Sequence, residues 1–140
     1  MKLLPAVLVA ALLSGGGPVF AETVFSCLTA KNNKQLRLMQ EGGELIYTYG
    51  KPDAAPELSL KVPLRKVEFY AWEGVGRAQN YIASLPNGDY WYRVYQSYDS
   101  LTRERSHGVL VEKADKLLAE IRCKPGSVSG DLMDYVLKTK

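Results

Sequence analysis

Residues 80–98, which read NYIASLPNGDYWYRVYQSY, decide the fold class. Two runs rich in aromatic and aliphatic residues lie on either side of the segment Pro86-Asn87-Gly88-Asp89. Asn-Gly is the strongest short signal for a hairpin, because a type I′ turn needs positive φ at both central residues. This stretch therefore predicts two antiparallel strands joined by a tight turn.

The same pattern of short alternating runs continues in both directions along the chain. Strands are expected at 23–28, 35–39, 45–49, 58–62, 68–72, 80–85, 90–98, 108–112 and 117–123. Turn residues separate them at 31–34 and 41–43, and Ala114-Asp115 predicts a tight connection between the last two strands. Consecutive hairpins on this spacing predict an all-β antiparallel sandwich or flattened barrel.

Side-chain alternation indicates which faces of the strands are buried. Leu58, Leu60 and Val62 alternate with polar residues, so one face of that strand is expected in the core. The hairpin around Asn87 differs, because aromatic residues such as Tyr92 and Trp91 occupy both of its faces. Either a second layer covers this surface or part of it binds a ligand.

The chain changes character after Cys123. Residues 124–127, Lys-Pro-Gly-Ser, predict a linker. Leu132, Tyr135 and Val136 then follow at helical spacing, with Asp131 near the start and Lys138 near the end. One short C-terminal helix is expected over 131–138.

The first residues predict export. Residues 1–21, MKLLPAVLVAALLSGGGPVFA, have a single charge at Lys2, an apolar run at 3–13 and Val19-Phe20-Ala21 at the end. This is the pattern of a signal peptide cleaved after Ala21, and the apolar run is too short to span a bilayer. Residues 22–140 would then form one periplasmic domain with no membrane span. A lipoprotein acylated at Cys27 is the alternative.

The two cysteines, Cys27 and Cys123, lie near the two ends of the predicted mature chain. An even pair in a small exported domain predicts a disulfide, with two buried free thiols as the alternative.

Composition excludes several function classes. Residues 22–140 carry 17 Lys plus Arg (18 less Lys2) and 15 Asp plus Glu, a net charge of +2. Basic and acidic residues alternate, so no nucleic-acid partner is expected. One histidine and two paired cysteines predict no metal site and no cofactor.

Catalysis is not expected either. His107 is the one candidate base, in a predicted polar loop with Asp99, Ser100 and Ser106. These residue types occur in catalytic triads, but they are also ordinary loop residues, and no strand-to-helix elbow presents a serine. We predict that the protein is not an enzyme.

The candidate binding residues surround residues 72–81, WEGVGRAQNY. Gly74 and Gly76 with Arg77 stand between the aromatic residues Trp72 and Tyr81, and an aromatic hairpin follows that includes Trp91. Trp, Tyr and Arg dominate binding hot spots, and a glycine-rich loop on a rigid sheet is able to enter a cleft. The alternative is that both flanking aromatics are core residues and the glycines only turn the chain.

A small exported β domain with one disulfide and a glycine-containing loop ending in tyrosine resembles the bacterial periplasmic lysozyme inhibitors. In that family the inserting loop carries a Ser-Gly-x-x-Tyr type motif. Gly76 and Tyr81 are the nearest matches here, Val75 stands in place of the serine, and four residues separate glycine from tyrosine. The chain is also similar to small exported proteins of proteobacteria.

The resemblance implies a periplasmic protein that inhibits a lysozyme-like cell-wall hydrolase, or an immunity protein against such a toxin. Arg77 would pair with an active-site carboxylate, Tyr81 would pack against the cleft wall and Trp72 would support the loop. The alternative function is a small-ligand or glycan-binding module that uses Tyr90, Trp91 and their aromatic neighbours in the hairpin.

Overall fold

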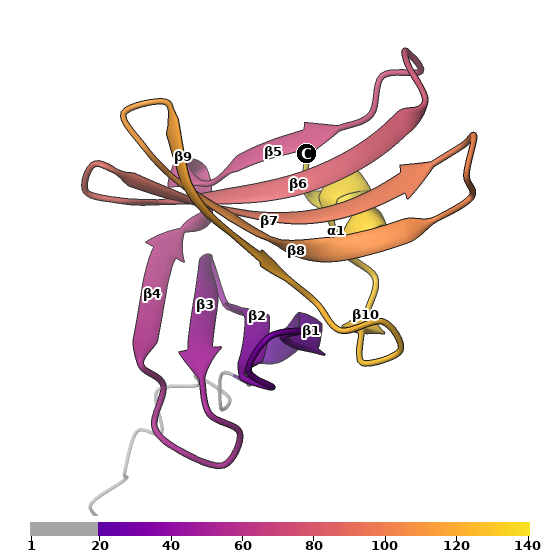
Figure 1. Ribbon diagram of the computed structural model, residues 1–140. Coiled ribbons are helices and arrows are strands. Elements are labelled where there is room, and N and C mark those ends of the chain that lie inside the picture. The colour runs from indigo at the N-terminus through magenta and orange to yellow at the C-terminus, as the bar shows by residue number, and fades with distance from the viewer. Residues whose placement is uncertain (1–19) are drawn as a thin grey trace, which may run out of the picture.

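Figure 1 shows the computed structural model, which describes residues 20–140. The predicted export signal at 1–21 lies outside this range except for its last two residues. Two five-stranded antiparallel sheets pack together, so the sandwich prediction is confirmed. Within residues 20–140, no helix is long and apolar enough to cross a membrane.

The first sheet has the order β10-β1-β2-β3-β4. Its strands are β1 (Glu22–Leu28), β2 (Gln35–Glu41), β3 (Glu44–Gly50), β4 (Leu58–Pro63) and β10 (Ser129–Gly130). A 3-10 turn, Leu64–Lys66, leads to the second sheet. That sheet follows chain order, with β5 (Glu68–Ala71), β6 (Ala78–Asn87), β7 (Tyr90–Asp99), β8 (Arg105–Lys113) and β9 (Lys116–Arg122).

The strands of the second sheet run steeply across those of the first (Figure 1). The core lies between the sheets and consists of the inward half of each alternating strand. In β4, Leu60 and Val62 are buried while Ser59 and Lys61 are exposed, as the alternation predicts. Phe25, Leu38, Leu45 and the other buried apolar side chains complete one continuous cluster.

The short C-terminal helix α1 (Leu132–Thr139) closes one side of the core. Asp131 caps its N-terminus by accepting a hydrogen bond from the Asp134 N–H, and Leu132 and Val136 are fully buried. The helix prediction is therefore confirmed within one residue at each end. Strand β10, which precedes the helix, was not expected, because two residues carry no alternation signal.

Two hairpins show how the turn residues act. In the β8–β9 turn, Ala114 and Asp115 have φ values of 50° and 62°, the positive pair that a type I′ turn requires. In the β6–β7 hairpin, Asn87 pairs with Tyr90, so the two central residues are Gly88 and Asp89. Only Gly88 of these two has positive φ, at 59°. The predicted hairpin is present, but Asn-Gly does not form a type I′ turn.

The predicted disulfide is present. Cys27 lies in β1, Cys123 directly follows β9, and their Cα atoms are 5.7 Å apart. The bond joins the two sheets and leaves no free cysteine among residues 20–140, which excludes the free-thiol alternative. Because it links positions 96 residues apart, the chain-entropy model gives a stabilisation of about 4 to 5 kcal/mol.

Candidate functional site

The loop between β5 and β6, residues 72–77, projects from the end of the second sheet. Gly74 and Gly76 have φ values of +87° and +82°, a conformation that other residues rarely adopt. A Cβ atom at either position would meet nothing within 4 Å. The glycines are therefore needed for backbone conformation and not for close packing, which fits a loop surrounded by solvent.

The tip of this loop is apolar and fixed in place. Val75 is 83% exposed. Its carbonyl oxygen accepts a hydrogen bond of 2.9 Å from the Trp72 indole N–H, and the Trp72 ring packs against the core. Trp72 thus supports the loop as expected, while the residue that it presents to solvent is a valine.

A second loop, residues 100–104 between β7 and β8, lies beside the first. The Asp99 carboxylate accepts hydrogen bonds from the backbone N–H groups of Leu101 at 2.9 Å and Thr102 at 3.2 Å. These bonds, led by the one from Thr102, hold the pKa of Asp99 below its ordinary value. Leu101, at the tip of this loop, is 71% exposed.

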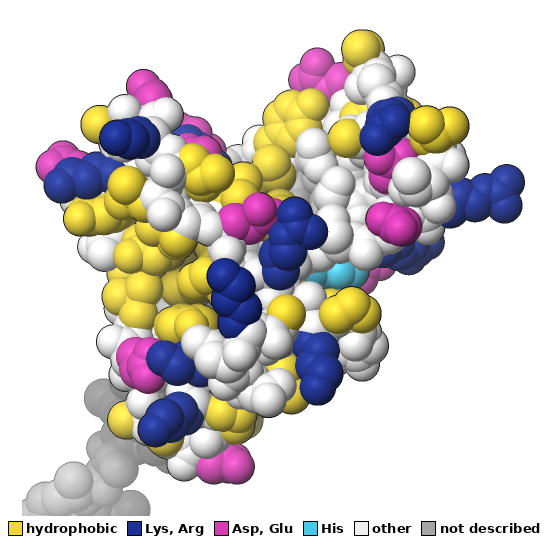
Figure 2. Space-filling model, in the orientation of Figure 1, with side chains coloured by type: hydrophobic (Ala, Val, Ile, Leu, Met, Phe, Trp, Pro, Cys, Tyr) yellow, Lys and Arg dark blue, Asp and Glu magenta, His cyan; other side chains and the backbone are white. Residues whose placement is uncertain are grey.

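Two contacts join the loops. Arg77 Nε lies 3.1 Å from the second carboxylate oxygen of Asp99, and the Ser100 N–H donates to the Arg77 carbonyl oxygen at 3.0 Å. Residues 72–77 and 99–104 therefore form one unit, which we call the two-loop ridge. In Figure 2 it forms the right-hand arm of the molecule.

Tyr81 does not belong to this ridge. It lies in β6 with 9% of its surface exposed, in the core cluster beside Ala83 and Leu85. Tyr81 is buried because the side chains of β6 alternate and Tyr81 falls on the inward face, so the structure does not bring it together with Gly76 and Arg77. For this residue the alternative, a core aromatic, is confirmed.

Trp91 lies far from the ridge. It pairs with Pro86 beside the β6–β7 turn, whereas the ridge begins where Ala78 pairs with Asp99 at the other end of the same strands. The Arg93 guanidinium stacks 5.1 Å from the Trp91 ring centroid. The structure therefore brings Trp72, Gly74, Gly76 and Arg77 together and leaves Trp91 separate.

The aromatic side chains of the β6–β7 hairpin point to both faces of the second sheet. Tyr92 points inward, where its ring centroid lies 5.5 Å from that of Tyr47 in β3. Trp91 and Arg93 point outward, and Arg93 contacts Glu112 at 2.6 Å and the buried Ser84 hydroxyl at 2.9 Å. The first sheet is the second layer that covers the inward face.

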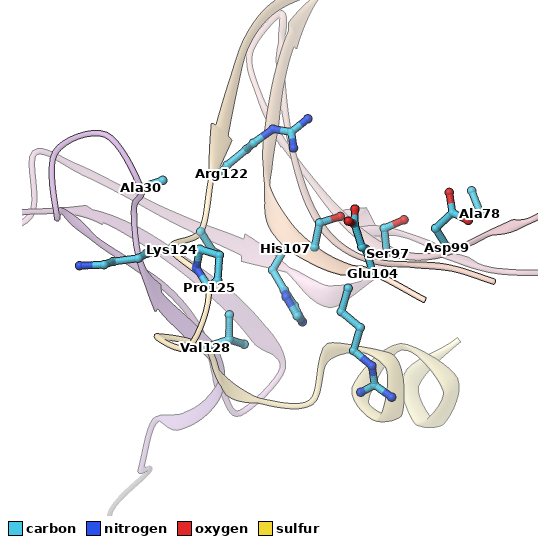
Figure 3. Close-up of a pocket in the computed structure, with 14 residues that line it drawn as sticks. Ala30, Ala78, Ser97, Asp99, Glu104, His107, Arg122, Lys124, Pro125 and Val128 are labelled. Carbon is cyan, nitrogen blue, oxygen red and sulfur yellow. The ribbon is translucent and has the colours of Figure 1, made fainter. Parts of the chain in front are cut away.

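His107 lies in β8 and not in the predicted loop, because β8 begins at Arg105. The His107 ring stacks on the Phe25 ring, with the two ring centroids 5.6 Å apart. Burial is the main cause that lowers the pKa of His107, and the positive charge of Arg105 lowers it further. A groove of about 720 Å³ passes this point, but Figure 3 shows His107 directed away from Ser97 and Asp99. Within residues 20–140, the His107 side chain has no hydrogen bond to a serine or a carboxylate.

No three potential metal ligands are grouped in this part of the chain.

The sequence did not predict that Leu101 is exposed at the tip of a second loop, or that Asp99 holds this loop in place. The local signal was the run Asp99-Ser100-Leu101-Thr102, in which an aspartate caps a turn. The pairing of Asp99 with Arg77 spans 22 positions in sequence and left no local pattern.

Comparison with protein-family models, with curated proteins and with solved structures gives no match.

Proposed function

We propose that the protein is an exported inhibitor that acts in the periplasm by inserting the two-loop ridge into the cleft of a lysozyme-like cell-wall hydrolase. An immunity protein against a delivered wall-degrading toxin would use the same surface. The observation that supports this function is that two exposed apolar residues, Val75 and Leu101, lie on neighbouring loops that are joined to each other through Arg77.

A projecting apolar ridge suits a concave partner. Scattered exposed apolar residues are normal on protein surfaces, but Val75 and Leu101 project from two loops that contact each other. Burying both tips in an enzyme cleft would remove apolar surface from water and exclude water from the site.

The fixed shape of the ridge favours affinity. A loop that must be ordered on binding loses free energy to that ordering, about 0.5 to 1.5 kcal/mol for each immobilised flexible side chain. Here Trp72 already holds the tip of the first loop and Asp99 holds the second. Arg77 joins the two, so its role in this proposal is to position the ridge, and Val75 and Leu101 contact the hydrolase.

The test is an inhibition assay with the exported, oxidised protein against a panel of lysozymes and other muramidases, together with co-elution on a sizing column. We expect a one-to-one complex and loss of lytic activity for at least one enzyme. Val75→Asp with Leu101→Asp should abolish both effects. The matched control is Leu117→Asp with Leu118→Asp, which places the same charges on exposed leucines of β9 and should leave inhibition unchanged.

Absence of a complex with every enzyme of the panel would contradict a general hydrolase inhibitor. Equal loss of inhibition in the ridge variant and in the β9 control would contradict the assignment of the ridge.

A further inference from the structure

The outward face of the second sheet is concave. Figure 2 shows a hollow between the two arms of the molecule, above the strands that Figure 1 draws at the top. A depression of about 230 Å³ on this face is lined by Asn80, Ile82, Tyr95, Ser97, Ser106, Leu110 and Glu120, of which only Glu120 is charged. None of these residues belongs to the two-loop ridge.

Three uncharged polar side chains form a row across the depression. Asn80 pairs with Ser97, and Ser97 pairs with Ser106, so the three lie side by side on adjacent strands. Within residues 20–140, none of their side chains takes part in a hydrogen bond. The row therefore offers one amide and two hydroxyls, each able to both donate and accept.

An apolar strip runs beside the polar row. Tyr70 pairs with Ile82 and Ile82 pairs with Tyr95, on the same outward face. Tyr70 does not line the depression itself, but it is 46% exposed and pairs with Ile82, which does. The Tyr95 ring instead forms part of the floor.

The floor is fixed by a glycine. A Cβ atom on Gly108 would lie 2.4 Å from the Ile121 carbonyl oxygen and 2.9 Å from the Tyr95 hydroxyl oxygen, closer than real contacts allow. Only glycine lets this ring cross β8, so that its hydroxyl donates to Glu120 at 2.9 Å. The lining is thus held by the sheet and does not depend on a loop.

The charges around the depression are already paired. Glu120 contacts Arg122 at 3.4 Å as well as Tyr95, and Arg93 contacts Glu112 at 2.6 Å. A charged ligand would have to compete with these pairs. The unpaired groups are neutral, which favours a neutral ligand that is rich in hydroxyls and also has an apolar face.

From this arrangement we infer that the concave face binds a neutral oligosaccharide. Sugar hydroxyls would bond to Asn80, Ser97 and Ser106, and the C–H face of a ring would pack on Tyr70 and Ile82. The inference is independent of the proposed inhibition, because the two surfaces share no residue.

The test is an NMR titration of the oxidised protein with cellotetraose and with chitotetraose. Binding with a Kd of about 1 mM is expected for such a shallow site, so about 10 mM sugar should approach saturation. Amide shifts should change at residues 80–82, 95–97 and 106–110. Unchanged spectra with both sugars, or changes confined to another face, would overturn the inference.

Variants sharpen this test. Tyr70→Ala, and separately Asn80→Ala with Ser97→Ala, should each weaken binding about tenfold. Tyr90→Ala makes the same kind of change on the opposite face of the sheet and should leave the Kd unchanged. Tighter binding of tetragalacturonate, an acidic tetrasaccharide, than of both neutral sugars would also overturn the proposal. Near-UV circular dichroism checks that every variant is folded.

Discussion

Strands β6 and β7 end in two different ways. At one end, Asn87 and Tyr90 are joined by a two-residue turn, and the aromatic Trp91 is covered by Arg93. At the other end, the strands run into the two-loop ridge, whose tips are Val75 and Leu101. At the hairpin end, Trp91 is covered by another side chain of the protein, while the ridge end presents the apolar side chains of Val75 and Leu101 to solvent. Residue type alone therefore does not show which end of the strands presents apolar side chains to solvent.

The largest expected effect is on the free energy of unfolding, and it compares the buried Tyr81 with Val75 in the ridge. Tyr81→Ala removes a buried ring and should lower the free energy of unfolding by about 3 to 5 kcal/mol. Val75→Ala, at the exposed tip, should change it by no more than about 0.5 kcal/mol. Urea unfolding of the two variants measures both values. Similar values for the two would mean that the tip is packed or that Tyr81 is not in the core.

The next largest effect on stability comes from replacing an arginine at each end of strands β6 and β7, Arg93 at the hairpin end and Arg77 at the ridge end. Arg93→Ala leaves the buried Ser84 hydroxyl and Glu112 without their partner, and should destabilise the protein by about 1 to 3 kcal/mol. Arg77→Ala removes a more exposed pair with Asp99 and should cost less than about 1 kcal/mol. A larger loss for Arg77→Ala in denaturant titrations would reverse the comparison.

The smallest expected effect is on how the stability of the protein depends on pH. Hydrogen bonds from Thr102 and Leu101, together with Arg77, lower the pKa of Asp99 below 3.8. Its contribution to stability is therefore complete above pH 3.8 and lost as pH falls through the lowered folded-state pKa. Asp99→Asn should flatten part of the acid limb of the stability curve, measured from about pH 5 to about pH 2. An unchanged acid limb would show that Asp99 does not hold the ridge through its charge.

Much of the fold was predictable because alternation and turn residues act locally. The period of two in β4 identified its buried face, and the two cysteines predicted the bond between the sheets. The start of β8 was missed because Arg105, Ser106 and His107 are polar, although all three pair with residues of β7. Its hydrogen bonds come from the rest of the sheet and not from local propensity.

The candidate site was predictable only in part. Gly74 and Gly76 indicated the loop, since both need positive φ. The loop was placed too far along the chain, because Tyr81 was treated as its end although Tyr81, Ala83 and Leu85 share the alternation of a buried strand face. The second half of the ridge depends on the contact between Arg77 and Asp99, which only the folded chain brings together.

In the function proposed above, the ridge and not the aromatic hairpin contacts the hydrolase. Hydrogen–deuterium exchange of the protein alone and in complex with the inhibited enzyme tests it most directly. We expect slower exchange on binding at residues 72–77 and 99–104, with no change at 86–91. Slower exchange at 86–91, with the ridge unaffected, would contradict it.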